Sequence, residues 1–115
     1  MKNQQTFIRT VLGDITPAEA GICYAHEHII IDESFPTVRN ELFLLNDLEK
    51  IVSELKAFYA SGGRTMVDTM PADAGRNILK LAEVSRRSSV NIVAPTGLHL
   101  EEYYLPNHWR YHYSE

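Results

Sequence analysis

The sequence predicts an α/β fold with a parallel sheet, and three observations indicate it. Strand-like and helix-like segments alternate in the order hairpin, strand, helix, strand, helix, strand, which is typical of right-handed βαβ units. The first long strand-like run, residues 22–31, is almost entirely apolar, as expected for a parallel strand that is covered on both faces. Gly or Pro residues separate the later segments from one another.

The length and composition of the chain exclude several classes of protein. The chain has 115 residues, of which 44% are hydrophobic and 23% charged, values that suit one small folded domain. Lys and Arg number 11 against 15 Asp and Glu, and the resulting net charge of −4 argues against a nucleic-acid partner. The single cysteine excludes an internal disulfide framework. Because neither a membrane-length apolar run nor a secretory signal is visible, we expect a cytoplasmic protein without a membrane partner.

The first elements are a predicted hairpin and the first strand of the sheet. Residues 7–15 predict the hairpin, with Gly13 and Asp14 in its tight turn. A Thr-Pro-x-Glu motif follows and predicts one short helical turn. Residues 22–28 then predict the first strand, in which Cys23 is expected to be a small buried core residue.

Residues 47–61 form the clearest predicted helix. Apolar side chains recur there at i, i+3, i+4 and i+7 spacing. Asn46 is the expected N-cap, and a Gly-Gly pair ends the helix. The preceding residues, 32–46, are predicted to be a loop, whose apolar cluster at 42–45 we expect to pack against the rest of the chain.

Two further strands and one helix complete the predicted pattern. Residues 65–70 predict the second strand, residues 74–87 a helix capped by Asp73, and residues 90–96 the third strand. The tail that follows is rich in aromatic side chains and shows no clear periodicity. The role of its residues 103–113 stays open.

The motif His26-Glu27-His28 carries the chemistry at the end of the first strand. Residues i and i+2 of a strand share a face, so the two imidazoles can lie side by side. Neutral imidazole binds zinc and other first-row divalent metals, and parallel α/β folds place their active sites at this end of their strands. The alternative is that both histidines are ordinary structural residues, since a zinc site needs three or four ligands.

Other polar side chains have competing interpretations. His108 and His112 have the i, i+4 spacing of a helical metal pair, but the aromatic residues around them favour a packing segment. For Asp68 a buried hydrogen-bond acceptor is favoured over an acid. Gly75 and Arg76 are expected to open the second helix, where an anion can bind, or Arg76 pins a carboxylate such as Asp68.

Several blocks of the chain, in the right order, resemble the N-terminal portion of the phosphotriesterase family, the aryldialkylphosphatase and phosphotriesterase-like lactonase group of the amidohydrolase superfamily. These blocks are Thr10–Gly21, Ala25–His28, Gly63–Asp68, Gly75–Arg76, Leu81–Ser85, Asn91–Ala94 and Thr96–Gly97. The resemblance implies the N-terminal part of a (β/α)8 TIM barrel: a hairpin, about three parallel strands and two helices.

The same resemblance implies a site. It implies a binuclear metal centre, usually zinc, with His26 and His28 as two ligands and the remaining ligands later in the barrel. It implies that His99 lies near the substrate pocket. The implied reaction is hydrolysis of phosphotriesters, lactones or related small-molecule esters by a metal-bound hydroxide. No catalytic residue of the family falls within this chain.

Two function hypotheses follow from the sequence. In the first, residues 1–115 are an incomplete N-terminal piece of a metal-dependent hydrolase barrel and are inactive alone. In the alternative, the chain is a small metal-binding or interaction module that forms a homo-oligomer through its open sheet edge. A third interpretation keeps the barrel but treats His26 and His28 as lining residues without a metal.

Overall fold

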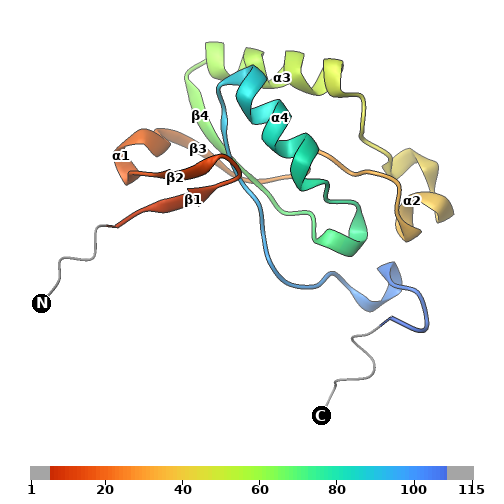
Figure 1. Cartoon of the computed structure of the whole chain (residues 1–115). Helices are drawn as coiled ribbons and strands as arrows, with labels where there is room; N and C mark the ends of the chain where they lie inside the picture. Colours follow the sequence, from red (N-terminus) through yellow and green to blue (C-terminus); the bar gives the residue numbers. More distant parts are fainter. Residues whose placement is uncertain (1–5, 109–115) are drawn as a thin grey trace, which may run out of the picture.

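The computed structural model describes residues 6–108 and shows a parallel sheet with helices on one face (Figure 1). The sheet has the strand order β3-β4-β5, and both strand pairs are parallel. Its elements are β3 (Ile22–Glu27), α3 (Leu48–Ala60), β4 (Gly63–Asp68), α4 (Ile78–Ser88) and β5 (Asn91–Val93). This is the predicted α/β fold with parallel strands joined by helices.

The hydrophobic core lies between the helices and the sheet. Helices α3 and α4 pack against each other over the central strand β4. The buried cluster consists of Ile29, Ile30, Ile51, Val52, Leu55, Met66, Leu81, Val84, Val90 and Ile92. Helix α3 follows the predicted spacing, but its N-cap is Asp47, whose side chain accepts from the Lys50 N–H, and not Asn46. Asn46 donates to Asp32 instead.

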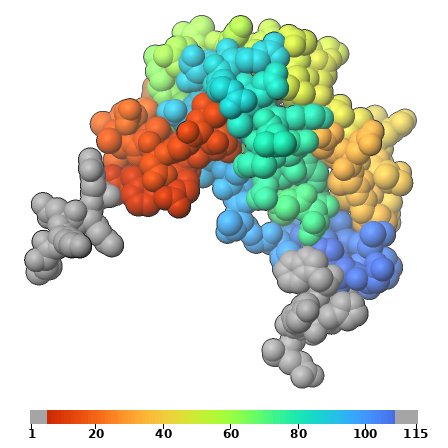
Figure 2. Space-filling view, viewed as in Figure 1, coloured from red at the N-terminus to blue at the C-terminus, as the bar shows by residue number. Residues whose placement is uncertain are grey.

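Strand β3 lies at an open edge of the sheet. The extents of the chain are 44 × 43 × 19 Å, and Figure 2 shows a hollowed arch. Ile22 is 67% exposed and Tyr24 52% exposed, although their residue types suit a covered strand. The prediction that Cys23 is buried is therefore wrong for this structure. Strand β3 has a partner only along β4, and no described element covers its faces.

The N-terminal hairpin forms, with a turn in a different place from the prediction. Strands β1 (Ile8–Thr10) and β2 (Gly13–Ile15) pair antiparallel, and Thr10 lies opposite Gly13. The turn consequently falls at residues 11 and 12, because the Thr10 hydroxyl bonds the Gly13 carbonyl at 2.7 Å and closes it. The Thr-Pro-x-Glu motif forms the short helix α1 (Pro17–Ala20) with its capping box.

The second predicted helix starts later than expected. Residues Ala72–Ala74 form a 3-10 turn, η2, and Gly75 follows with a positive φ of 113°. Asn77, not Asp73, caps α4 by accepting from the Lys80 N–H. The helix N-terminus expected at Gly75 does not exist, and Arg76 donates to the Pro95 carbonyl rather than to Asp68.

Two strand boundaries also differ from the prediction. Strand β4 begins at Gly63, which lies opposite Ile22, and ends at Asp68, whose carboxylate accepts from the Met70 N–H. Strand β5 stops at Val93 rather than at residue 96. Pro95 has no N–H to donate, and the engagement of its carbonyl by Arg76 leaves this stretch outside the ladder.

The segment predicted as a loop contains two short helical elements. These are α2 (Phe35–Arg39) and the 3-10 turn η1 (Glu41–Phe43), and a further turn η3 (Glu101–Tyr103) lies after β5. The apolar cluster at 42–45 does not pack as expected, since Leu42 is 87% exposed and its three successors are also exposed. Within residues 6–108, no helix has the length and apolarity needed to cross a bilayer.

Gly63 gives a direct test of the packing of α3 on the sheet. A Cβ atom at this position would lie 2.2 Å from the Phe58 ring. We expect Gly63→Ala to lower the free energy of unfolding by about 1–3 kcal/mol through overpacking. Urea unfolding followed by circular dichroism measures this. In a Phe58→Leu background the same substitution should cost less, and an equal cost in both backgrounds would contradict the assigned contact.

Candidate functional site

The structure brings His26 and His28 side by side at the carboxyl end of β3. Their ring centroids are 5.6 Å apart, and the ring planes meet at 81°. The pairing of β3 with β4 changes register between Tyr24 and Glu27. This irregularity spans Ala25 and His26, so it includes the first histidine of the pair. The predicted juxtaposition is present, whereas metal ligation by the pair stays a prediction.

Backbone and side-chain contacts fix the orientation of this strand end. The Thr69 N–H donates to the Glu27 carbonyl at 2.8 Å, which continues the β3–β4 ladder. The Thr69 hydroxyl lies 3.4 Å from His28 Nδ1. Glu27 Oε1 accepts from the His28 N–H at 2.8 Å, and Glu27 borders a groove beside α3. Glu27 therefore supports the His28 backbone rather than joining the imidazole pair.

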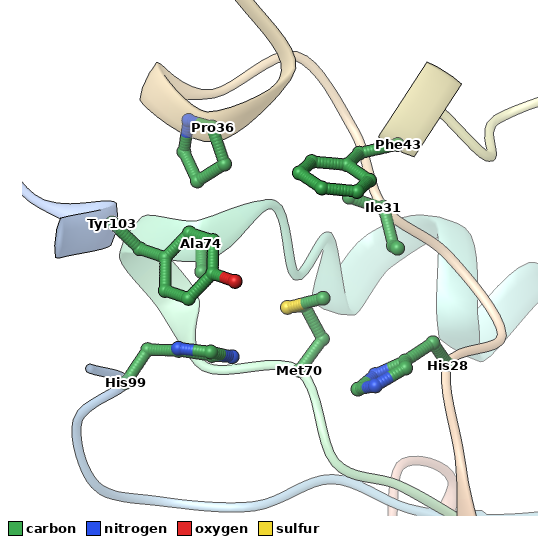
Figure 3. Close-up of a pocket in the computed structure, with 8 residues that line it drawn as sticks. All are labelled: His28, Ile31, Pro36, Phe43, Met70, Ala74, His99 and Tyr103. Carbon is green, nitrogen blue, oxygen red and sulfur yellow. The ribbon is translucent and has the colours of Figure 1, made fainter. Parts of the chain in front are cut away.

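A pocket of about 190 Å³ opens next to His28 (Figure 3). His99 lies across the pocket from His28, and Met70 lies between them. The lining is otherwise mostly apolar and comes from four separate segments of the chain: His28, Ile31, Pro36, Phe43, Met70, Ala74, His99 and Tyr103. Sequence reasoning named His28 and His99, but no pattern in the chain marked the other residues.

His99 is held at the pocket wall, in surroundings that lower the pKa of its imidazole. Its Nδ1 accepts from the Leu100 N–H at 2.8 Å, and its ring makes an edge contact with Tyr103 at 4.2 Å between centroids. Burial lowers the pKa of His99, and repulsion from His28 lowers it further. Both effects favour the neutral form of the imidazole, and the Glu102 carboxylate opposes them.

Asp68 is fully buried directly beneath the site. Its carboxylate accepts from the Met70 N–H at 2.8 Å and from the Ile30 N–H at 3.4 Å. Burial raises the pKa of this carboxyl, while the N–H donors act in the opposite direction. Asp68 is thus the buried hydrogen-bond acceptor that the sequence favoured, and it joins the loops that follow β3 and β4.

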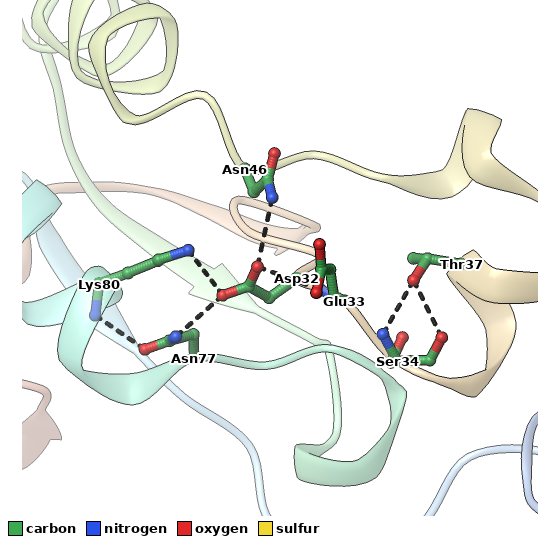
Figure 4. A network of polar contacts seen from close by, with 7 residues as sticks. All are labelled: Asp32, Glu33, Ser34, Thr37, Asn46, Asn77 and Lys80. Atoms are coloured by element: carbon green, nitrogen blue, oxygen red, sulfur yellow. Dashed lines mark hydrogen bonds and ion pairs between the residues drawn. The ribbon is translucent and has the colours of Figure 1, made fainter.

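A second carboxylate, Asp32, organises the outer part of the site (Figure 4). Its Oδ2 accepts from Lys80 Nζ at 2.7 Å and from Asn77 Nδ2 at 2.9 Å. Its Oδ1 accepts from Asn46 Nδ2 at 3.3 Å and from the Glu33 N–H at 3.1 Å. These donors, the Lys80 ammonium first among them, hold the pKa of Asp32 far below its usual range. Its partners are up to 48 positions away, so sequence spacing gives no signal for this network.

The described residues do not form a complete metal-binding cluster. Among residues 6–108, no group of three or more His, Cys, Asp or Glu side chains is arranged to hold a metal ion. His108 Nε2 lies 2.7 Å from an Asp73 carboxylate oxygen, and His112 lies outside the described residues. Two adjacent imidazoles still fit a divalent metal as an incomplete ligand set, since both are nitrogen donors in reach of one another.

Parallel strands joined by helices, with the imidazole pair at the carboxyl end of a strand, are the arrangement expected of part of an α/β barrel. The sequence model of the phosphotriesterase family matches residues 6–110. The chain belongs to the phosphotriesterase family.

Relatives and solved structures agree with this assignment. A phospho-furanose lactonase of Mycoplasmopsis synoviae is 33% identical over 105 residues, which cover 88% of this chain and 30% of the relative. An amidohydrolase structure from Mycoplasma synoviae matches with a TM-score of 0.83 and 32% identity, covering 92% of this chain and 31% of that one. A lactonase structure from Listeria monocytogenes matches with a TM-score of 0.74 and 38% identity, covering 80% and 28%. The chain therefore spans about three tenths of the length of these proteins.

The depressed pKa of Asp32 predicts how stability depends on pH. In the unfolded chain, Asp32 has a pKa of about 3.9 and takes up a proton at a pH at which the folded chain still keeps it ionised. The contribution of Asp32 to the free energy of unfolding is therefore fully present above about pH 4. This contribution is lost as the pH falls further. The difference in unfolding free energy between the wild type and Asp32→Asn should stay constant from about pH 8 to pH 5 and shrink below pH 4.

Denaturant titrations across this pH range measure the difference. Asp14→Asn is the matched control, because Asp14 pairs with Arg9 at 2.8 Å on the exposed hairpin. Exposed ion pairs contribute little to stability. The difference in unfolding free energy between the wild type and Asp14→Asn should therefore be smaller than that for Asp32→Asn above about pH 5. A wild-type advantage over Asp32→Asn that vanishes already between pH 7 and pH 5 would contradict the assigned pairing.

Proposed function

We propose that this chain supplies the first part of a metal-dependent hydrolase that acts on lactones, phosphotriesters or related esters. The observation that carries the proposal is the His26–His28 imidazole pair at the carboxyl end of β3, beside a pocket whose far wall holds His99. The relatives named as lactonases support this class of substrate. The chain covers 30% of the Mycoplasmopsis synoviae lactonase, so the activity is proposed for a protein of the relatives' full length.

His26 and His28 are the residues that would hold a divalent metal, and zinc is the metal we propose. A bound metal of this kind polarises the substrate oxygen and lowers the pKa of bound water. The chain's own part is to present the two rings next to each other at the end of β3. The hydrogen bonds from the Thr69 N–H to the Glu27 carbonyl and from the His28 N–H to Glu27 Oε1 fix the end of β3 that carries the two rings.

The described pocket suits the ester or lactone part of a substrate. Most of its lining is apolar, and its polar groups are few, as in most small-molecule sites. His99 lines this pocket, and its partial burial lowers the pKa of its imidazole. We assign His99 to the substrate-facing wall on this basis.

Metal binding is the first test of this function. We expect the purified chain to bind one zinc ion at neutral pH, and either His26→Ala or His28→Ala to abolish the bound equivalent. Isothermal titration calorimetry gives the stoichiometry and affinity. His108→Ala is the matched control because its ring contacts the Asp73 carboxylate and is not part of the pair, and it should retain zinc. Unchanged stoichiometry in both pair variants would remove the ligand assignment.

Hydrolysis is tested in a chimera that supplies the rest of the barrel. Residues 6–108 would replace the matching segment of the Mycoplasmopsis synoviae lactonase, to which the chain is 33% identical. We expect the zinc-loaded chimera to hydrolyse a lactone, and His26→Ala or His28→Ala to abolish this activity. The 115-residue chain alone should hydrolyse neither a lactone nor paraoxon, because its described residues provide two clustered ligands at most. A folded, zinc-loaded chimera without activity would contradict the proposal.

A further inference from the structure

The segment between Asp32 and Asn46 forms one wall of the pocket. The two ends of this segment pair with each other, and we call this pairing the neck. Ile31 and Leu45 exchange two backbone hydrogen bonds of 2.9 Å at this neck. Next to them, Asp32 Oδ1 accepts from Asn46 Nδ2 at 3.3 Å. Side chains of α2 and η1, which lie beyond the neck, point toward the pocket (Figure 3).

The same aspartate also reaches the opposite wall. Its Oδ2 accepts from Asn77 and Lys80 at the start of α4, as Figure 4 shows. Its backbone N–H donates to the Gly75 carbonyl at 2.7 Å. A Cβ atom at Gly75 would lie 2.9 Å from the Asp32 carbonyl oxygen, so the two backbones touch. Ala74, directly before this contact, lines the pocket.

Away from the neck, the wall is held by packing of α2 against η2, where Pro36 and Thr37 are buried. Val38 is 83% exposed and Leu42 is 87% exposed. The Arg39 guanidinium donates to the Glu102 carbonyl at 3.3 Å in an exposed contact. The position of the wall therefore depends on this packing and on the neck, where Asp32 contacts both sides.

We propose that Asp32 is a positioning residue that sets the separation of the two pocket walls and thereby the shape that a substrate meets. The effect on substrate rests on the proposed hydrolase function. The effect on the separation of the pocket walls does not depend on that function. Lys80 supplies the cationic partner at 2.7 Å, and the side chains of this pair are only 33% and 20% exposed. A pair shielded to this degree is less screened by salt than an exposed one.

The two internal methionines report separately on the pocket and on the core. Met70 lines the pocket, and Met66 belongs to the core cluster under α3 and α4. In chain labelled with ¹³C at the methionine methyl groups, we expect Asp32→Ala to move or broaden the Met70 signal and to leave the Met66 signal in place. Asp14→Ala, which removes an equally short ion pair on the hairpin, should change neither.

Two results would overturn the geometric part. One is an unchanged Met70 signal in Asp32→Ala, and the other is an equal displacement of the Met66 signal, which would make Asp32 a general stabiliser of the fold. Where Asp32→Ala fails to fold, Lys80→Met replaces it. That variant removes only the cation and should displace Met70 in the same direction by less.

The substrate part is tested in the lactonase chimera. We expect Asp32→Ala to lower kcat/KM by about tenfold to a hundredfold, as small misplacements of a binding surface do, while zinc binding stays unchanged. An unchanged kcat/KM together with a displaced Met70 signal would overturn the substrate part. An inactive parent chimera would overturn the proposed hydrolase function and leave the Met70 result standing.

Discussion

The buried carboxylate of Asp68 is the interaction on which the site depends. It lies at the end of the central strand and accepts N–H groups from the loop after β3 and from the loop after β4. Burying a carboxylate is costly unless it is hydrogen-bonded, so the arrangement that satisfies this group is strongly favoured over others. That arrangement places Met70 in the pocket between His28 and His99.

The open sheet is the second constraint. Helices α3 and α4 bury one face of the sheet, while β3 keeps exposed apolar side chains at its edge. Exposed sheet edges favour association with further strands. The described residues bring two imidazoles together, and no third His, Cys, Asp or Glu joins them in a metal-binding group. A barrel site collects its residues from the ends of several strands, of which this sheet has three.

Local patterns predicted a large part of the fold. The apolar spacing identified α3, and the capping box identified α1, because both depend on neighbours within four positions. The start of α4 was misplaced because Asp73 and Asn77 are both acceptable caps, and the backbone contact of Gly75 with Asp32 decided between them. Cys23 was misjudged because burial depends on what covers a strand, which its own sequence does not state.

The sequence by itself determined the alternation of strands and helices, the family and the spacing of His26 and His28 on one strand. These features are local, or are carried by ordered blocks of residues. Only the tertiary structure decided that His99 lies across a pocket from His28 and that Asp32 joins Asn46 to Lys80. The physical reason is that these contacts join residues at least 14 positions apart in the sequence. Such residues meet only when the helices pack on the sheet and bring the loops at the carboxyl ends of its strands together.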